Sequence, residues 1–224
     1  HCLLLWRLMN LLIEKGHKTR AFGVDYEFRI MLRWFHQGVL DGKDMADVTP
    51  LLKEDGTPFK VAVLIPTINN ADELDIVLGR LAKQTYTDFE IVISDSKSKD
   101  HTKEVCDKYG VTWIDDPSRN RANACNYALE RMDHDLVLFT DDDTIPPLDW
   151  VEKLVRWFDD PEVGAVGGPN FAPDEDPFGA KCADVAFCTK FMTAGTRYGA
   201  QPKGKLVPIT HNPGVNCAHR MANL

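Results

Sequence analysis

The sequence lacks features that define several classes of protein. Its 6 cysteines contain no Cys-x-x-Cys pair, so neither a zinc site nor a disulfide scaffold is indicated, and a reducing, cytoplasmic setting is expected. Basic residues do not predominate, and the formal net charge of -8 argues against nucleic acid as a partner. No stretch reaches the roughly 20 apolar residues that cross a bilayer, because Arg7 and Asn10 interrupt the most apolar segment, residues 2–13.

The residues that are present predict one globular domain with a helical extension. Hydrophobic residues make up 44% of the 224 positions, which is enough for a sizeable core. Residues 1–40 predict two amphipathic helices that dock on the main domain, contact a membrane surface or belong to an upstream domain, and we favour docking. Residues 41–59 predict a linker. Because the chain starts at His1 and stops at Leu224 without a terminating pattern, we expect it to be a fragment.

From residue 60 onward, short apolar runs alternate with segments of helical periodicity. The alternation predicts an α/β fold with a parallel, doubly wound sheet and helices on its faces. Asn70 or Asp72 is expected to cap the first helix. The predicted strands are 61–65, 89–93, 111–114, 135–140 and 163–166, and the predicted helices are about 70–81, 102–109, 121–131 and 149–158.

Polar residues follow three of these predicted strands. Because ligands of such sheets bind beyond the carboxyl ends of the strands, we expect the three groups to face one cleft. The groups are Pro66, Thr67 and Asn69 after the first strand, 95–100 after the second, and Asp141, Asp142 and Asp143 after the fourth. Adjacent carboxylates repel each other, and a hard divalent cation removes that repulsion and recruits phosphate oxygens. An isolated acidic triplet would be a solvated loop, but its position after an apolar run favours a metal site.

The strand ends resemble the motifs of the inverting family 2 glycosyltransferases, which have the GT-A fold, a Rossmann-like, mostly parallel sheet flanked by helices. The family's opening strand, followed by Pro-Thr, an aromatic residue and Asn-Glu, is similar to VAVLIPTINN, with Ile68 and Asn70 as departures. Its Asp-Asp-Gly-Ser-x-Asp loop resembles DSKSKD, in which Ser96 and Lys97 depart. The resemblance runs from about Lys60 to the last residue, and it implies a nucleotide-sugar-binding domain over 60–224 whose C-terminal acceptor part is missing.

The resemblance also implies roles for individual residues. Asp141 and Asp143 occupy the outer positions of the family's D-x-D motif, which implies that they bind Mn²⁺ or Mg²⁺ and, through it, the diphosphate of a nucleotide sugar. Asp142 is then a spacer or a ribose contact. Bound there, the metal stabilises the negative charge that builds on the departing diphosphate.

The nucleotide itself is expected to contact several further residues. Thr67 and its neighbours Pro66 and Asn69 are expected to hold the ribose and base edge. Asp95 is expected to accept a hydrogen bond from a base N–H, whereas Asp100 is equally suited to helix capping.

The segment before the acidic triplet resembles the family's stretch of a small residue, Arg and Asn. Asn126 matches it, but Cys125 stands where the arginine is usual. We therefore expect Arg119 or Arg121 to supply the missing guanidinium to the diphosphate, although either could be a surface residue.

The function implied by the resemblance is that of a metal-dependent hexosyltransferase. It would move a sugar from a UDP- or GDP-sugar to a glycan or lipid-linked acceptor with inversion, and its later segment is most similar to the branch that builds surface polysaccharides in bacteria and archaea. The family's general base lies in an acidic motif that the chain stops short of, so no catalytic residue is assigned and poor transfer is expected. We expect a cytoplasmic location, or the cytoplasmic face of a membrane reached through parts outside this chain.

Two further features remain open, as do two other functions. A helix over about 178–191 could meet a membrane or lipid acceptor, or pack on the sheet, and His211 is a weak candidate for a further metal ligand. A nucleotide-sugar-binding module without catalysis is the main alternative. A phospho-acceptor receiver domain fits badly, since its paired acids belong after the first strand, where this chain has Pro66 and Thr67.

Overall fold

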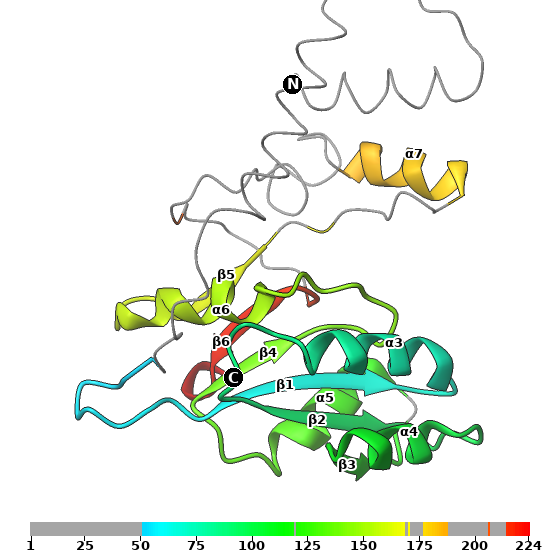
Figure 1. Cartoon of the computed structure of the whole chain (residues 1–224), viewed down its shortest axis with the longest axis horizontal. Helices are drawn as coiled ribbons and strands as arrows, with labels where there is room; N and C mark the ends of the chain where they lie inside the picture. The colour runs from blue at the N-terminus through cyan, green and yellow to red at the C-terminus, as the bar shows by residue number, and fades with distance from the viewer. Residues whose placement is uncertain (1–50, 119, 169, 171–176, 188–205, 207–213) are drawn as a thin grey trace, which may run out of the picture. The chain divides into compact units, whose positions relative to one another are not determined.

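The computed structural model describes residues 51–118, 120–168, 170, 177–187, 206 and 214–224 (Figure 1). The two predicted N-terminal helices, Arg119 and His211 lie outside the described residues. The chain divides into two units. One contains the sheet and the other contains helix α7, Phe178–Phe187, which covers the first part of the predicted 178–191 helix. None of the described helices is long and apolar enough to cross a membrane.

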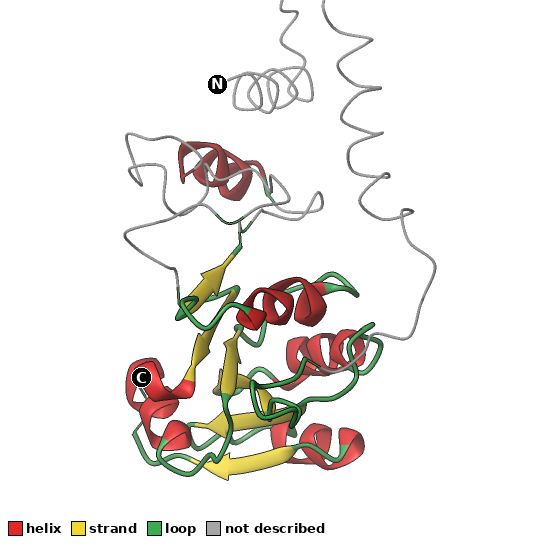
Figure 2. Ribbon diagram, turned by 90° about the vertical axis from the view of Figure 1, so that its left-hand side faces the viewer, coloured by secondary structure: helices red, strands yellow, loops and turns green. Residues whose placement is uncertain are grey.

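The first unit is built on one mixed sheet of six strands in the order β3-β2-β1-β4-β6-β5 (Figures 1 and 2). The strands are β1 Val61–Thr67, β2 Glu90–Asp95, β3 Thr112–Asp115, β4 Leu136–Phe139, β5 Ala165–Gly167 and β6 Cys217–Arg220. Strands β1 to β4 pair in parallel, whereas β6 runs antiparallel to both β4 and β5. The predicted mostly parallel sheet is therefore confirmed. Strand β6 was not predicted, because its sequence CAHR is short and has no continuous apolar run.

Alternate residues of β1 face opposite sides of the sheet and enter two separate cores. Val61, Val63 and Ile65 belong to the larger core, whereas Ala62 and Leu64 belong to the smaller one. All five side chains are nearly or completely buried. A strand covered on both faces loses the polar alternation of a half-exposed strand, which explains the continuous apolar run in the sequence.

Helices cover the two faces of the sheet. The larger core takes buried side chains from α3 Ala71–Leu81, α4 Thr102–Tyr109, α6 Trp150–Val155 and the 3₁₀ turn η1 Arg156–Asp159. The smaller core takes them from α5 Arg121–Leu129. A second 3₁₀ turn, η2 Met221–Asn223, follows β6. Four predicted helices are therefore confirmed, although α5 and α6 end earlier than expected.

Asn70, one of the two residues predicted to cap α3, occupies its N-cap position, but its side chain does not cap the helix. Instead, Asp100, at the end of the loop after β2, accepts a hydrogen bond from the backbone N–H of Ala71 at 3.0 Å. Its other oxygen accepts bonds from the N–H and hydroxyl of Thr102 at 3.2 and 2.6 Å. Asp100 therefore holds the starts of α3 and α4 together, in line with its capping role.

Helix α4 ends at a glycine that needs its conformational freedom. Gly110 has φ of 65°, and a Cβ added to it would meet no atom within 4 Å. Alanine would therefore fit sterically, but the left-handed backbone would cost about 1 kcal/mol. We expect Gly110→Ala to lower the free energy of unfolding by about that amount in a urea titration, whereas Gly179→Ala in α7, whose Cβ also meets no atom within 4 Å, should not lower it. If Gly110→Ala and the parent unfold at the same urea concentration, Gly110 is not needed to end α4.

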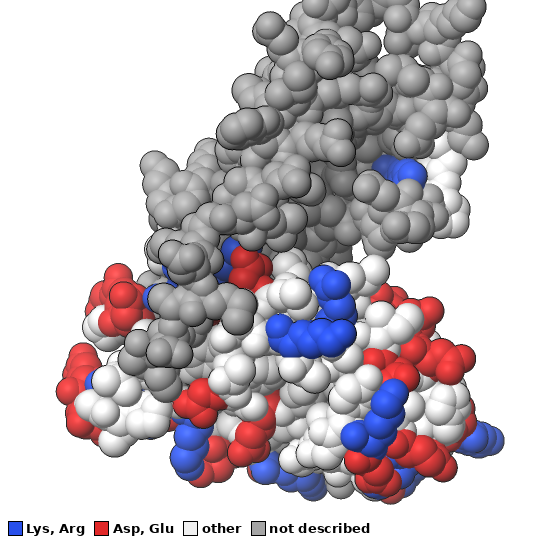
Figure 3. Space-filling view, in the orientation of Figure 1, with Lys and Arg blue, Asp and Glu red and all other residues white. Residues whose placement is uncertain are grey.

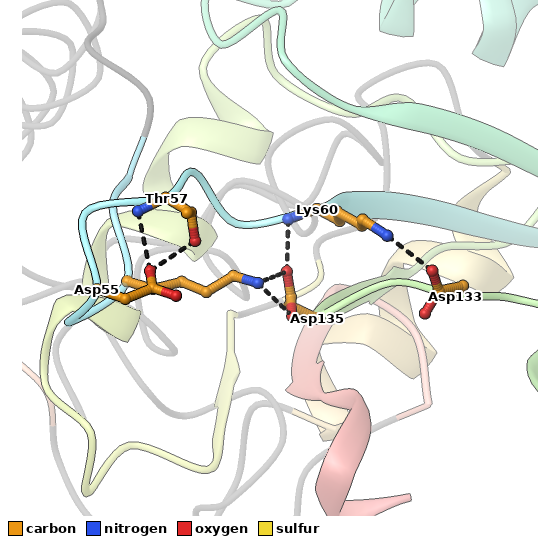
Figure 4. Close-up of polar contacts among 6 residues, drawn as sticks. Asp55, Thr57, Lys60, Asp133 and Asp135 are labelled. Atoms are coloured by element: carbon orange, nitrogen blue, oxygen red, sulfur yellow. Dashed lines mark hydrogen bonds and ion pairs between the residues drawn. The ribbon is translucent and has the colours of Figure 1, made fainter.

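The described end of the predicted linker is folded onto the sheet. Residues 51–60 form a turn closed by a bridge between Leu52 and Pro58. Lys53 Nζ lies 2.8 Å from Asp135 at the start of β4, and the Lys60 N–H donates to the same carboxylate at 2.7 Å (Figure 4). Burial opposes ionisation of Asp135, but these hydrogen bonds outweigh it and lower its pKa. The contact therefore stabilises the fold at neutral pH and is lost as the pH falls below about 4.

Charged side chains other than Lys53 and Asp135 contribute less to the stability of the fold. Acidic and basic side chains of the described residues are interspersed on the face shown in Figure 3. Lys108 of α4, for example, pairs with Asp75 of α3 at 2.7 Å, and both side chains are exposed. Exposed pairs contribute about 0 to 1 kcal/mol, so the sheet unit depends mainly on its two cores.

Candidate functional site

A cleft of about 270 Å³ opens at the carboxyl ends of the central strands. Its walls come from the ends of β1, β2 and β4 and from the start of α5. The lining residues are Pro66, Thr67, Ile68, Ser96, Asn120, Arg121, Asp141, Asp142 and Asp143. Residues from all three strand ends therefore meet in one cleft, as expected from the topology of a parallel sheet.

Six of the nine predicted site residues line this cleft, and three do not. Asp95 is only 3% exposed, and its carboxylate accepts hydrogen bonds from Trp113 Nε1 at 3.1 Å and from the Ser98 N–H at 2.9 Å. Asn69 has φ of 51° and accepts a bond from the Lys99 N–H at 2.7 Å, which joins the loops after β1 and β2. Asn126 is exposed on α5. The nucleotide contacts assigned to these three residues stay predictions.

Asp142 lines the cleft, is partly buried and is held by a hydrogen bond from a neighbouring strand. Its Oδ2 accepts a hydrogen bond of 2.5 Å from the hydroxyl of Thr67, at the end of β1. Burial raises the pKa of Asp142, and the hydrogen bonds from Thr67 and Asn70 oppose that shift. The middle aspartate therefore links the ends of β4 and β1, a role that a spacer would not have.

Arg121 provides positive charge in the cleft. Its Nε and Nη2 donate to Asp141 Oδ1 at 2.9 and 2.5 Å, and Nη2 also donates to the Gly214 carbonyl at 2.8 Å. Burial disfavours the guanidinium charge, but Asp141 outweighs it and raises the pKa of Arg121. The helix start that carries Arg121 is capped by Asn120, which accepts from the N–H groups of the second and third helical residues. Of the two arginines considered from the sequence, Arg121 lines the cleft.

Cys125, one turn further along α5, is unsuited to bind phosphate. It is 8% exposed and belongs to the smaller core. Burial raises the pKa of its thiol, so it stays neutral at physiological pH. It therefore packs the helix against the sheet.

Ser96, Asn120 and Ile68 line the cleft but were not predicted as site residues. Ser96 and Ile68 were noticed only as departures from the family motifs. Their positions directly after strands β2 and β1 were the available signal, because every residue at such a strand end is a candidate.

The donor set of the cleft fits a hard divalent cation that binds together with a phosphate ligand. Three carboxylates and one guanidinium line it, so an incoming diphosphate would meet excess negative charge without a further cation. Among the described residues, no group of three or more His, Cys, Asp or Glu side chains is placed to hold a metal by itself. Mg²⁺ commonly takes only one or two protein carboxylates plus substrate phosphates, which matches this arrangement.

A family model, Glycosyl transferase family 2, matches residues 62–216. Among curated proteins, the glycosyltransferase AglE of Haloferax volcanii is 29% identical over 119 residues, covering 50% of this chain and 39% of that protein. An N-acetylglucosaminyltransferase of Azorhizobium caulinodans is 30% identical over 164 residues, covering 66% of this chain and 41% of that protein. The chain thus spans about two fifths of the length of these relatives.

Solved structures show the same fold at low identity. A structure of S. aureus TarS aligns with a TM-score of 0.52 and 19% identity, covering 73% of this chain and 47% of that chain. Glucosyl-3-phosphoglycerate synthase from Mycobacterium tuberculosis, in complex with Mn²⁺, UDP and glucosyl-3-phosphoglycerate, aligns with a TM-score of 0.51 and 19% identity, covering 73% and 57%. These alignments confirm the GT-A fold of the sheet unit.

Proposed function

This chain belongs to glycosyl transferase family 2, and we propose that its cleft binds a nucleotide-diphosphate sugar whose sugar is transferred to a glycan or lipid-linked acceptor. The observation that carries the proposal is the meeting of Thr67, Arg121 and the acidic triplet in one cleft at the strand ends. A guanidinium and a divalent metal ion both bind diphosphate oxygens, and hydrogen-bonding oxygens bind a ribose. The cleft offers all three.

Asp141 and Asp143 would hold Mn²⁺ or Mg²⁺ in this cleft. When bound, the metal would stabilise the negative charge on the leaving diphosphate. Asp142 accepts a hydrogen bond from the Thr67 hydroxyl and would contact the ribose from the end of β4. Arg121 would contact diphosphate oxygens, for which its planar fork of donors is suited.

The complex of glucosyl-3-phosphoglycerate synthase with Mn²⁺ and UDP supports a metal-bound nucleoside diphosphate in this fold. The names of the relatives support glycosyl transfer, since AglE is a glycosyltransferase and the Azorhizobium caulinodans protein an N-acetylglucosaminyltransferase. Inversion at the anomeric carbon is proposed on family membership. A UDP- or GDP-sugar is the proposed donor.

The direct test is calorimetric titration of the chain with UDP and with GDP, each with and without Mn²⁺. We expect at least one nucleotide to bind, and Mn²⁺ to tighten that binding about tenfold or more, because the metal removes the repulsion between carboxylates and diphosphate. Titration with uridine and guanosine, which lack phosphate, is the control and should show no Mn²⁺ effect. The absence of metal-enhanced binding to both diphosphates would refute the proposal.

A further inference from the structure

We propose that Gly214 keeps Arg121 Nη1 open to a diphosphate, because the Gly214 carbonyl holds the guanidinium and the missing side chain leaves that nitrogen accessible. This inference rests on the proposed function, since the ligand is the diphosphate of the bound nucleotide. Gly214 lies 93 positions from Arg121 in the sequence, shortly before strand β6. It would act as a positioning residue, through Arg121.

The hydrogen bonds of Arg121 leave one of its nitrogens unused. A guanidinium carries five N–H donors, one on Nε and two on each Nη. Nε and Nη2 donate to Asp141 Oδ1, and Nη2 also donates to the Gly214 carbonyl at 2.8 Å. Within the described part of the chain, Nη1 donates to no protein atom. Because the Arg121 side chain is 46% exposed and lines the cleft, both N–H groups of Nη1 are available to a ligand.

The two partners of Arg121 come from different parts of the fold and hold the guanidinium from two directions. Asp141 directly follows Thr140 at the end of β4, and Gly214 precedes β6. A donor whose orientation is already held loses less conformational freedom when a ligand binds. The Gly214 carbonyl therefore contributes to diphosphate binding without contacting the ligand.

The usual conformational reason for a glycine does not apply at position 214. Among the described glycines, positive φ occurs at Gly56 and Gly110 and not at Gly214. Gly214 is also exposed, so no tightly packed interior excludes a side chain there. The three atoms nearest to a Cβ added at Gly214 all belong to the Arg121 guanidinium. The space that Gly214 leaves empty is thus next to Arg121.

A methyl group at position 214 would crowd Nη1 in particular. The added Cβ would lie 3.3 Å from Nη1 and 4.0 Å from both Cζ and Nη2 of Arg121. The contact with Nη1 is tighter than ordinary van der Waals contact, so the methyl group would either cover Nη1 or push the guanidinium away from its partners. Both effects weaken a charge-assisted hydrogen bond to the diphosphate, and the loss of one such bond corresponds to about a tenfold loss of affinity.

The test is calorimetric titration of Gly214→Ala with UDP and with GDP in the presence of Mn²⁺. We expect the Kd of the nucleotide that the parent binds to rise about tenfold. Gly164→Ala is the matched control, because its Cβ would also crowd a side-chain nitrogen, Asn223 Nδ2 at 2.8 Å, and neither residue lines the cleft. The control should keep the parent Kd.

A double-mutant cycle with Arg121→Ala separates an effect on Nη1 from a general disturbance of the chain. Arg121→Ala alone should weaken nucleotide binding about tenfold, and Gly214→Ala should cause no further loss in that background. A displaced chain would instead weaken binding in both backgrounds, and that result would overturn the inference. A parent Kd in Gly214→Ala would also overturn it and leave the proposed function standing. If neither UDP nor GDP binds the parent, both proposals fall.

Discussion

Replacing Asp143 with alanine is expected to remove the Mn²⁺-dependent part of nucleotide binding. Asp143 is exposed in the cleft, and within the described part of the chain no hydrogen bond or ion pair involves its side chain. Its removal should therefore leave the fold intact. Loss of partners outside the direct coordination of a metal typically costs 10- to 100-fold in metal affinity, so loss of a direct ligand should cost on the order of 100-fold.

The measurement is the ratio of nucleotide Kd values without and with Mn²⁺, which should fall to about one in Asp143→Ala. Asp88→Ala is the matched control, because it removes the same charge from an exposed position that does not line the cleft. Urea titrations should give equal stabilities for both variants. If Asp143→Ala keeps the parent's Mn²⁺ enhancement, Asp143 is not a metal ligand and the D-x-D assignment fails.

Asp141→Ala is less suited to this test. Asp141 also binds Arg121 at 2.5 Å, so its removal would free the guanidinium as well as a metal site. The released Arg121 could bind diphosphate more tightly and partly hide the loss of the metal. Asp141→Ala and Asp143→Ala are therefore expected to give different results, because only Asp141 forms an ion pair with Arg121 among the described residues.

Replacing Arg220 with alanine is expected to lower the free energy of unfolding by about 3 kcal/mol. Arg220 ends β6, and its guanidinium donates to the carbonyls of Val163, Phe158 and Asp160 at 2.9, 3.0 and 3.1 Å. It also lies 5.3 Å from the ring centre of Phe158. Hydrogen bonds to charged groups contribute about 1.5 to 3 kcal/mol each, and partial exposure of the site reduces their sum.

Urea unfolding measures this effect. Arg220→Lys should recover less than half of the lost stability, because an ammonium cannot reproduce the planar fork that reaches three carbonyls. Arg156→Ala is the control, since that exposed guanidinium lies 4.8 Å from the Trp157 ring, a contact of about 0.5 to 1 kcal/mol. If Arg220→Ala lowers the free energy of unfolding by less than about 1 kcal/mol, the antiparallel part of the sheet does not depend on the hydrogen bonds of Arg220.

The parallel part of the fold could be predicted because its strands are covered on both faces. The run 61–65 is apolar at every position, since its residues enter two cores. Strand β6 gave no such signal. Its residues Ala218 and Cys217 are buried, but His219 and Arg220 are only partly so, and its partners β4 and β5 are distant in sequence. Such pairing depends on tertiary contacts rather than on local pattern.

Part of the site could also be predicted. Thr67 and the acidic triplet were chosen from their places after strands, and Arg121 as one of two substitutes for the family arginine that Cys125 replaces; the structure brings them together. Asp95 was chosen by the same rule, yet it turns toward Trp113. Asp95, the last residue of β2, is buried, whereas Ser96 directly after it lines the cleft. Sequence position alone did not decide which one does.

The sequence by itself determined the α/β class, the parallel strands and the strand ends that carry polar residues, because these follow from local apolar runs and from a general rule of sheet topology. The tertiary structure decided which polar groups are free to meet a ligand. Asp100 is used in capping two helices, Asp95 bonds to Trp113, and Asp116 orients the hydroxyl of Ser96. Each of these choices depends on a hydrogen-bonding partner far along the chain, and a carboxylate's role is set by which donors surround it.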